Sequence, residues 1–318
     1  MRVLVTGGTN GMGKGVARAL AARDGASHDV VILGRSPERG ASTIDEIRRD
    51  TGNSRVSFVT CDLTRMSDVA RAVDQIRTDG RALDGIFVNA GVGYAAARVE
   101  TGDGFDTHFQ VNYLSQFVLT LRLLDLMQRS DSGGRVVFNV TEGGRMFWDD
   151  PQLRTRWSYE AAIHQAMVAK RMCYGRLHAL ARRIDGSRTA FFGFQIPKTV
   201  WSHQIAIVPW PMRAMATLVK WFGGFISIDR CGEIIAPLFT EPQEASLARS
   251  GHFITATAAG FVAKDEDPAV ADPSAQEQLW RLSLEWCGDA EARRIAAAWA
   301  GAAATSGPLT DAARRSPA

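Results

Sequence analysis

The amino-acid sequence predicts an α/β fold, a doubly wound parallel sheet of about seven strands with helices on both faces. Three observations predict this class. Short apolar runs alternate with amphipathic helical stretches along most of the 318-residue chain, which is typical of parallel strands joined by helices. A glycine-rich turn lies between the first apolar run and the first helix. Hydrophobic residues make up 46% of the chain and charged residues 22%, so a sizeable core can form.

The first half of the chain supplies four strands and four helices. "RVLVTG" is a buried strand, and the helix "GKGVARALAAR" follows it. "DVVILGR" is the second strand, and the Ser-Pro pair after it favours the start of a helix. "VSFVTCD" and "LDGIFVNAG" are the next two strands by the same apolar pattern. The predicted strands are 2–7, 29–35, 56–62 and 83–91, and the predicted helices are 13–23, 36–52, 66–80 and 105–129.

The second half continues the alternation. "GRVVFNVT", residues 134–141, is the fifth strand, and the loop 142–157 leads into a long helix over 159–183. Two further apolar runs, 188–197 and 251–258, complete the seven strands. No internal repeat is found.

One domain is expected over residues 1–290, with an apolar substrate lid of short helices at about 203–230. The most apolar stretch, 205–228, is long enough to span a bilayer, but prolines, glycines and two basic residues interrupt it. We therefore expect no membrane span. The Ala-rich residues 291–318 are predicted to start as a helix and to end as a flexible tail.

Charge and cysteine content exclude several function classes. The net charge is +3 and the basic residues are scattered, which argues against a nucleic-acid partner. Four cysteines lie far apart, without metal-ligand spacing: Cys61, Cys173, Cys231 and Cys287. They are predicted to be reduced thiols of a cytoplasmic protein, and no metal site is expected. The chain begins directly with a strand, so we expect no signal peptide. Whether the protein forms a homo-oligomer stays open.

The glycine-rich turn is predicted to bind a dinucleotide. Gly7 permits a tight turn, Gly11 lets the backbone approach a pyrophosphate, and Gly13 lets the helix pack closely on the strand. The phosphates would lie at the helix N-terminus, where free N–H groups favour anions. The other predicted contacts in the turn are Thr9, Asn10 and Met12. Such a motif is a strong signal when it follows the first strand and opens the first helix.

The residues that follow the second predicted strand indicate which nicotinamide cofactor is bound. NAD sites usually carry an acidic residue at this point, whereas this chain has Arg35 followed by Ser36. An arginine suits the 2′-phosphate of NADP, so we expect NADP rather than NAD. An arginine whose stem only covers the end of a strand is the alternative.

Several motifs resemble those of the short-chain dehydrogenase/reductase family. "TGGTNGMG" resembles the TGxxxGxG loop of that family, and "VNAG" resembles its NNAG motif. The C-terminal segment from "SGHFITATA" onward is similar to the tail of the retinol dehydrogenase branch. The resemblance covers about residues 1–290 and implies a single Rossmann domain. It further implies cofactor contacts at Asp62, Leu63, Asn89, Ala90, Gly91, Pro197, Val200 and Ser202, and a catalytic asparagine at Asn112.

The resemblance also shows where the chain departs from the family pattern. The family uses Tyr and Lys as YxxxK, one helical turn apart on the same face of the helix. "AKRMCYGRLHALARR" aligns Lys170 with the family lysine, which implies contact with the cofactor ribose, and places Ala166 at the tyrosine position. The cofactor half of the site is kept, whereas the usual proton donor is absent. Loss of a positioned acid typically costs about 10²–10⁴ in rate.

Four residues are candidates for the missing role. Thr141 or Glu142 occupies the family's serine position, depending on how the fifth strand is aligned. Burial could raise the pKa of Glu142 and make it an acid or base, although a loop carboxylate is often solvated. His164 has a suitable unperturbed pKa but points away from Lys170 on a regular helix. Tyr159 shares the face of Lys170 but lies about 16 Å along the axis. We rank Thr141 and Glu142 first.

Three functions remain open on these grounds. The first is an NADP(H)-dependent oxidoreductase with a non-standard proton donor. The second is a non-redox enzyme on this fold, such as a cyclase, isomerase or dehydratase, and the third is a protein that senses NADP without turnover. Aromatic and Met residues near the predicted substrate mouth favour an apolar, aromatic or polycyclic small molecule. They are Phe147, Trp148, Trp157, Trp201, Trp210, Met212 and Met215.

Overall fold

The computed structural model describes residues 1–200 and 224–305 together with positions 215, 217 and 221. Eight strands of this part form one sheet: β1 Arg2–Thr6, β2 Asp29–Gly34, β3 Val56–Thr60, β4 Gly85–Val88, β5 Arg135–Asn139, β6 Ala190–Gln195, β9 Phe253–Thr257 and β10 Gly260–Lys264. Their order in the sheet is β10-β9-β6-β5-β4-β1-β2-β3. A short pair, β7 Thr199–Val200 and β8 Phe225–Ile226, lies apart from it.

The sheet confirms the predicted class and adds one strand. Every pairing from β3 across to β9 is parallel, which gives the seven expected strands. Strand β10 pairs antiparallel with β9 and forms the edge. A two-residue connection ending at Gly260, whose φ is +116°, closes this hairpin. That backbone conformation suits glycine, because a Cβ atom would be strained there.

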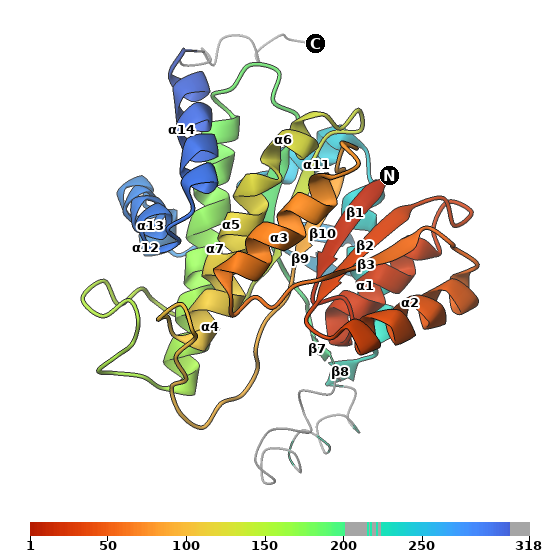
Figure 1. Cartoon of the computed structure of the whole chain (residues 1–318), viewed down its shortest axis with the longest axis horizontal. Coiled ribbons are helices and arrows are strands. Elements are labelled where there is room, and N and C mark those ends of the chain that lie inside the picture. The colour runs from red at the N-terminus through yellow and green to blue at the C-terminus, as the bar shows by residue number, and fades with distance from the viewer. Residues whose placement is uncertain (201–214, 216, 218–220, 222–223, 306–318) are drawn as a thin grey trace.

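Helices cover both faces of the sheet (Figure 1). The larger helices are α1 Gly11–Ala21, α2 Pro37–Thr51, α3 Met66–Arg77, α5 Ser115–Arg122, α7 Tyr159–Ala181, α9 Ile228–Ile235, α13 Pro273–Trp286 and α14 Ala290–Thr305. The shorter ones are α4 Thr107–Phe109, α6 Leu124–Gln128, α10 Pro237–Thr240, α11 Gln243–Arg249 and α12 Pro268–Ala271. One buried cluster includes side chains of α3, α5 and α7, and a second includes side chains of α1, α2 and α9.

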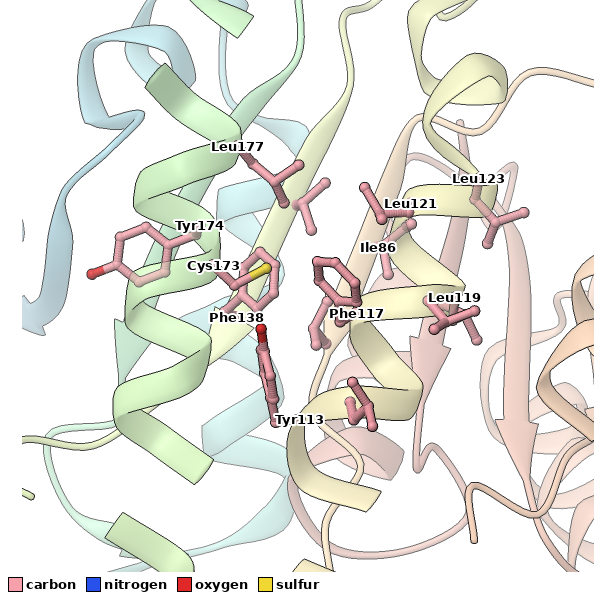
Figure 2. Packing of buried hydrophobic residues seen from close by; sticks show 14 of the residues in the cluster. Ile86, Tyr113, Phe117, Leu119, Leu121, Leu123, Phe138, Cys173, Tyr174 and Leu177 are labelled. Atoms are coloured by element: carbon pink, nitrogen blue, oxygen red, sulfur yellow. The ribbon is translucent and has the colours of Figure 1, made fainter. Parts of the chain in front are cut away.

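Large aromatic side chains fill the space between α7, α5 and the sheet (Figure 2). Tyr113 lies 6.0 Å from Phe117 between ring centroids, and Phe138 of β5 lies 5.9 Å from Tyr174 of α7. All four are buried. This packing fixes α7 against the carboxyl half of β5, which is where the candidate catalytic residues lie.

The long helix predicted over 105–129 is present over most of that range but is not continuous. The segment is α4, then a π-helical turn, η1 Gln110–Leu114, then α5 and α6. The break between α5 and α6 is at Leu123, whose φ and ψ are −105° and −1°. Single π-turns within helices occur often at functional sites, and this one contains Asn112.

The Ala-rich segment is helical as far as Thr305. Trp299 of this helix is buried and its ring centroid lies 6.1 Å from that of Phe191 in β6. The segment therefore packs with the rest of the domain up to that point, and 306–318 lie outside the described residues. Most of the predicted lid, 203–230, also lies outside them. Within the described ranges, no helix combines the length and the apolarity that crossing a bilayer requires.

Candidate active site

The glycine-rich turn has the close backbone approaches that a phosphate site needs. Gly7 has φ +68°, and a Cβ atom added there would meet Ala90 Cα at 2.9 Å. A Cβ on Gly13 would meet the carbonyl oxygen of Gly7 at 2.4 Å. Asn10 caps α1 by accepting a hydrogen bond from Gly11 N at 2.7 Å. The turn therefore leaves backbone N–H groups at the start of α1 free of side-chain bulk.

The residues predicted to bind adenosine lie at the ends of β2 and β3. Arg35 is exposed directly after β2, and Ser36 caps α2 by accepting from Arg39 N at 3.2 Å. Asp62 accepts hydrogen bonds from the backbone N and the hydroxyl of Thr64 at 3.0 and 2.8 Å. Leu63 is buried, and its carbonyl accepts from Ser115 Oγ at 2.7 Å. These bonds fix the chain at the ends of β2 and β3, where Arg35 is an exposed cation.

A chain of hydrogen bonds joins the phosphate turn to α7. Asn89 donates from Nδ2 to the Thr6 carbonyl at 3.0 Å, and its Oδ1 accepts from Asn139 Nδ2 at 3.2 Å. The carbonyl of Asn139 accepts from Lys170 Nζ at 3.3 Å. Thus strands β1, β4 and β5 and helix α7 meet at the carboxyl edge of the sheet, where ligands of such sheets bind.

Asn112 lies next to this chain. Its Oδ1 accepts from Val92 N at 2.8 Å, and a Cβ on Gly91 would meet the same atom at 3.1 Å. Gln116 donates to the carbonyls of Ala90 and Asn112 at 2.7 and 3.2 Å. The structure therefore brings together the predicted residues 89–91, 112 and 170.

Lys170 is buried in α7 with 1% of its surface exposed. Burial lowers its pKa from 10.5 to about 7, because an ammonium ion is less stable away from water. Ala166, one turn earlier, is fully buried within the cluster that packs under α7. A lysine that titrates near neutrality is suited to proton transfer.

The two first-ranked candidates follow β5. Thr141 is exposed. The side chain of Glu142 is 56% exposed and forms an ion pair with Lys264 of β10. The burial expected for Glu142 is therefore not found, because the loop runs along the surface and the neighbour of the carboxylate is a cation of β10, not an apolar wall.

His164 and Tyr159 lie nearer the start of α7. His164 has 37% of its side chain exposed and lines a surface pocket with Arg145, Phe147 and Glu160. Tyr159 packs edge-on against Tyr94, with ring centroids 5.2 Å apart. Burial raises the pKa of Tyr159. Among the described residues, Lys170 donates to the carbonyl of Asn139, whereas Tyr159 packs on Tyr94 and His164 lies beside Glu160.

The loop before α7 is held in place by buried polar groups. Asp150 accepts hydrogen bonds from Arg154 N at 2.7 Å and from Thr155 N at 2.9 Å, and such bonds lower its pKa to about 2 although its partial burial acts in the opposite direction. Trp157 donates from Nε1 to buried Asp106 at 3.0 Å. These anchors hold the loop beside the start of α7 and, through Asp106, beside the start of α4.

Three charged residues of this region were not predicted. They are Arg171, Lys264 and Glu266, which form ion pairs around the loop after β5. Arg171 follows the predicted lysine directly, but only the fold brings the other two, about a hundred residues later, to the same place. Of the remaining predicted contacts, Pro197 is exposed and Val200 is buried after β6, whereas Ser202 lies outside the described residues, as do Trp201, Trp210 and Met212.

The mostly parallel sheet, with a tight glycine-rich turn between β1 and α1, defines a Rossmann-like α/β fold. Residues 1–149 match the family described as short chain dehydrogenase. This N-terminal part of the chain, just under half of its length, therefore carries the sequence pattern of the short-chain dehydrogenase/reductase family.

Two curated relatives and a solved structure illustrate the similarity. Polyprenol dehydrogenase of Danio rerio is 34% identical over 172 residues, 52% of this chain. That match covers about half, 52%, of the relative's own length. Human retinol dehydrogenase 12 is 29% identical over 290 residues, 90% of this chain and 86% of the relative. A short chain dehydrogenase from Shigella flexneri 2a, solved with NADP, shares the fold with a TM-score of 0.58, at 21% identity over 80% of this chain and 95% of that one.

Proposed function

We propose that this chain is an NADP(H)-dependent oxidoreductase that interconverts a carbonyl and an alcohol on an apolar small molecule, with a proton donor other than tyrosine. The observation that carries the proposal is the hydrogen-bonded connection from the phosphate turn to buried Lys170. A site kept only as a remnant would have little reason to hold a costly buried cation at the end of such a chain.

The residues present fit the nicotinamide cofactor. The turn at Gly7 and Gly13 has no space for side chains and would accept a pyrophosphate. Arg35 would hold a 2′-phosphate, and Lys170 would bind the ribose. When bound, the cofactor supplies the hydride. Lys170 would then stabilise or move the accompanying proton, and Thr141 would orient the substrate oxygen by a hydrogen bond.

The substrate class rests on the relatives and on the wall of the site. The relatives are named for polyprenol and retinol, which are apolar alcohols. Phe147, Trp148 and Trp157 lie in the loop before α7, and Trp148 packs against the core. We propose that this loop faces an apolar substrate of that kind. We also propose a cytoplasmic location, supported by four buried cysteines, all of them free.

A panel assay tests the function. Purified protein is mixed with NADPH and long-chain or aromatic aldehydes, ketones and enones, and with NADP⁺ and the matching alcohols. We expect turnover of at least one apolar carbonyl, followed by NADPH absorbance and by product analysis. No change in NADPH absorbance in either direction, with any member of the panel, would contradict the proposal.

Cofactor preference gives a second test. We expect Arg35→Ala to weaken NADP(H) binding by roughly 10- to 100-fold, because a charge-assisted contact contributes about 1.5–3 kcal/mol. NAD(H) affinity should change little. Fluorescence titration measures both, and Arg49→Ala, at the other end of α2, is the matched control because it removes the same charge from an exposed position. Equal loss of both cofactors would argue against a 2′-phosphate contact.

A non-redox enzyme is the second candidate, and buried Ala166 at the tyrosine position favours it. Such an enzyme would convert an apolar substrate into an isomer or a dehydrated product while the cofactor pocket shapes the site. Product analysis in the same panel, with the cofactor bound but not consumed, distinguishes the two.

A further inference from the structure

Two cations join the loop after β5 to the C-terminal hairpin. Lys264, the last residue of β10, pairs with the carboxylate of Glu142. The same ammonium group donates to Oε1 of Gln195, the last residue of β6, at 3.0 Å. Lys264 thus bridges the ends of two neighbouring strands at the edge of the sheet that carries the candidate catalytic residues.

Arg171 makes the second connection. Its side chain is 3% exposed, and it donates to the carbonyl of Gly143 at 2.9 Å and to Oε1 of Glu266 at 3.0 Å. The other carboxylate oxygen of Glu266 accepts from the hydroxyl of Tyr174 at 3.0 Å. Burying a guanidinium without a partner is unfavourable, so Glu266 is what allows Arg171 to lie here.

The backbone of this loop needs such support. Gly143 and Gly144 both adopt left-handed conformations, with φ of +75° and +86°. Glycine reaches these angles freely but is also the residue with the most alternatives. The hydrogen bond from the Arg171 guanidinium therefore fixes the direction of the Gly143 carbonyl. The ion pair with Lys264 fixes the position of the Glu142 carboxylate. Both cations also lie within 6 Å of the Phe253 ring of β9, at 5.7 and 5.4 Å from its centroid.

We propose that Lys264 and Glu266 are positioning residues of the active site. Lys264 through Glu142, and Glu266 through Arg171, hold residues 141–143 in the conformation that presents Thr141 to the substrate oxygen. This inference rests on the proposed function, because it assumes that Thr141 contacts the substrate oxygen. Lys264 and Glu266 lie more than a hundred residues after Thr141 in the sequence. The proposed role makes residues 264–266 a support of the candidate site and not only the end of an edge strand.

Glu266→Gln tests the inference, since it keeps the shape of the side chain and removes its charge. We expect kcat to fall by about 10²-fold, as a misplacement of about 1 Å can cause, while the Kd for NADPH stays within twofold. Glu266→Asp should restore part of the loss. Glu266→Gln in a Thr141→Ala background should lower kcat little further, because both changes act on the one contact of Thr141 with the substrate. A double variant whose loss of kcat equals the product of the two single losses would overturn the proposed route through the loop.

A readout that needs no activity separates this inference from the proposed function. Amide hydrogen exchange of residues 141–145 should become faster in Glu266→Gln than in the wild type. Glu277→Gln is the matched control. Glu277 pairs with Arg176, which lies on α7 like Arg171 but away from the loop. Unchanged exchange in Glu266→Gln would overturn the positioning role. Faster exchange in a protein that reduces no carbonyl would uphold the positioning role and contradict only the proposed function.

Discussion

Lys170→Met is expected to inactivate the protein and to stabilise its fold at the same time. Loss of the ammonium group would remove the proposed ribose contact and the proposed proton-transfer group, so kcat/KM for carbonyl reduction should fall by about 10²–10⁴-fold. Stability should rise because Lys170 is 1% exposed and its charge is unfavourable there. Methionine fills a similar volume without that charge. The opposed effects are typical of functional residues.

The pH dependence of this stabilisation has a definite sign. Burial lowers the pKa of Lys170 from 10.5 to about 7, so the folded chain binds fewer protons than the unfolded chain between these values. The stability of the wild type therefore rises with pH across this window. The gain from Lys170→Met should be largest below pH 7, where it amounts to a few kcal/mol at about 1.4 kcal/mol per pKa unit, and should vanish toward pH 10.5.

Thermal unfolding of the wild type and variant at pH 6 and pH 9.5 measures this effect. Lys170→Arg is the control, because it keeps a cation in the same place and should give no stabilisation. A variant that is less stable than the wild type at pH 6 would mean that Lys170 is not a buried charge in solution.

Ala166→Tyr is expected to raise reductase turnover and to lower stability. A phenol at this position would lie one helical turn before Lys170, on the same face of α7. The neighbouring cation would lower the pKa of the phenol, which suits it to donate a proton. We expect kcat on a simple ketone to rise by roughly 10- to 100-fold, within the range that a positioned acid contributes. Because Ala166 is fully buried, overpacking should cost about 1–3 kcal/mol.

Ala166→Phe separates the two consequences, since it adds the ring without the hydroxyl group. Both variants should lose similar stability, and only the tyrosine should gain turnover, measured as initial rates with NADPH. An equal gain in Ala166→Phe would assign the effect to pocket shape. No gain in either variant would indicate that another acid is already well placed or that the protein is not a reductase.

Much of the fold could be predicted because its signals are local. The apolar runs and the glycine turn fix the seven parallel strands, and a parallel sheet buried on both faces has few other ways to arrange them. The break at Leu123 and the π-turn around Asn112 were missed, since the apolar pattern of 105–129 continues through both. Strand β10 was missed because an exposed edge strand does not need the run of apolar residues that marks a buried strand.

The candidate site, like the fold, could be predicted only where its signals are local. The places of Asn89, Asn112 and Lys170 on or beside their elements could be predicted because each lies in a short motif tied to one element, whereas their roles toward a cofactor stay predictions. The state of Glu142 could not be predicted, since its partner Lys264 is brought to it only by the hairpin. Charges that meet across more than a hundred residues carry no sequence pattern of their own.

The late position of the hairpin in the chain has a consequence for the order of folding. Strands β1–β5 and α7 are complete by residue 181, and as the chain emerges from the ribosome they can begin to assemble on their own contacts. Lys264 and Glu266 join them only after β9 has paired with β6. The loop that carries Thr141 lacks these two ion pairs until then, so the candidate site is completed later than the core that supports it.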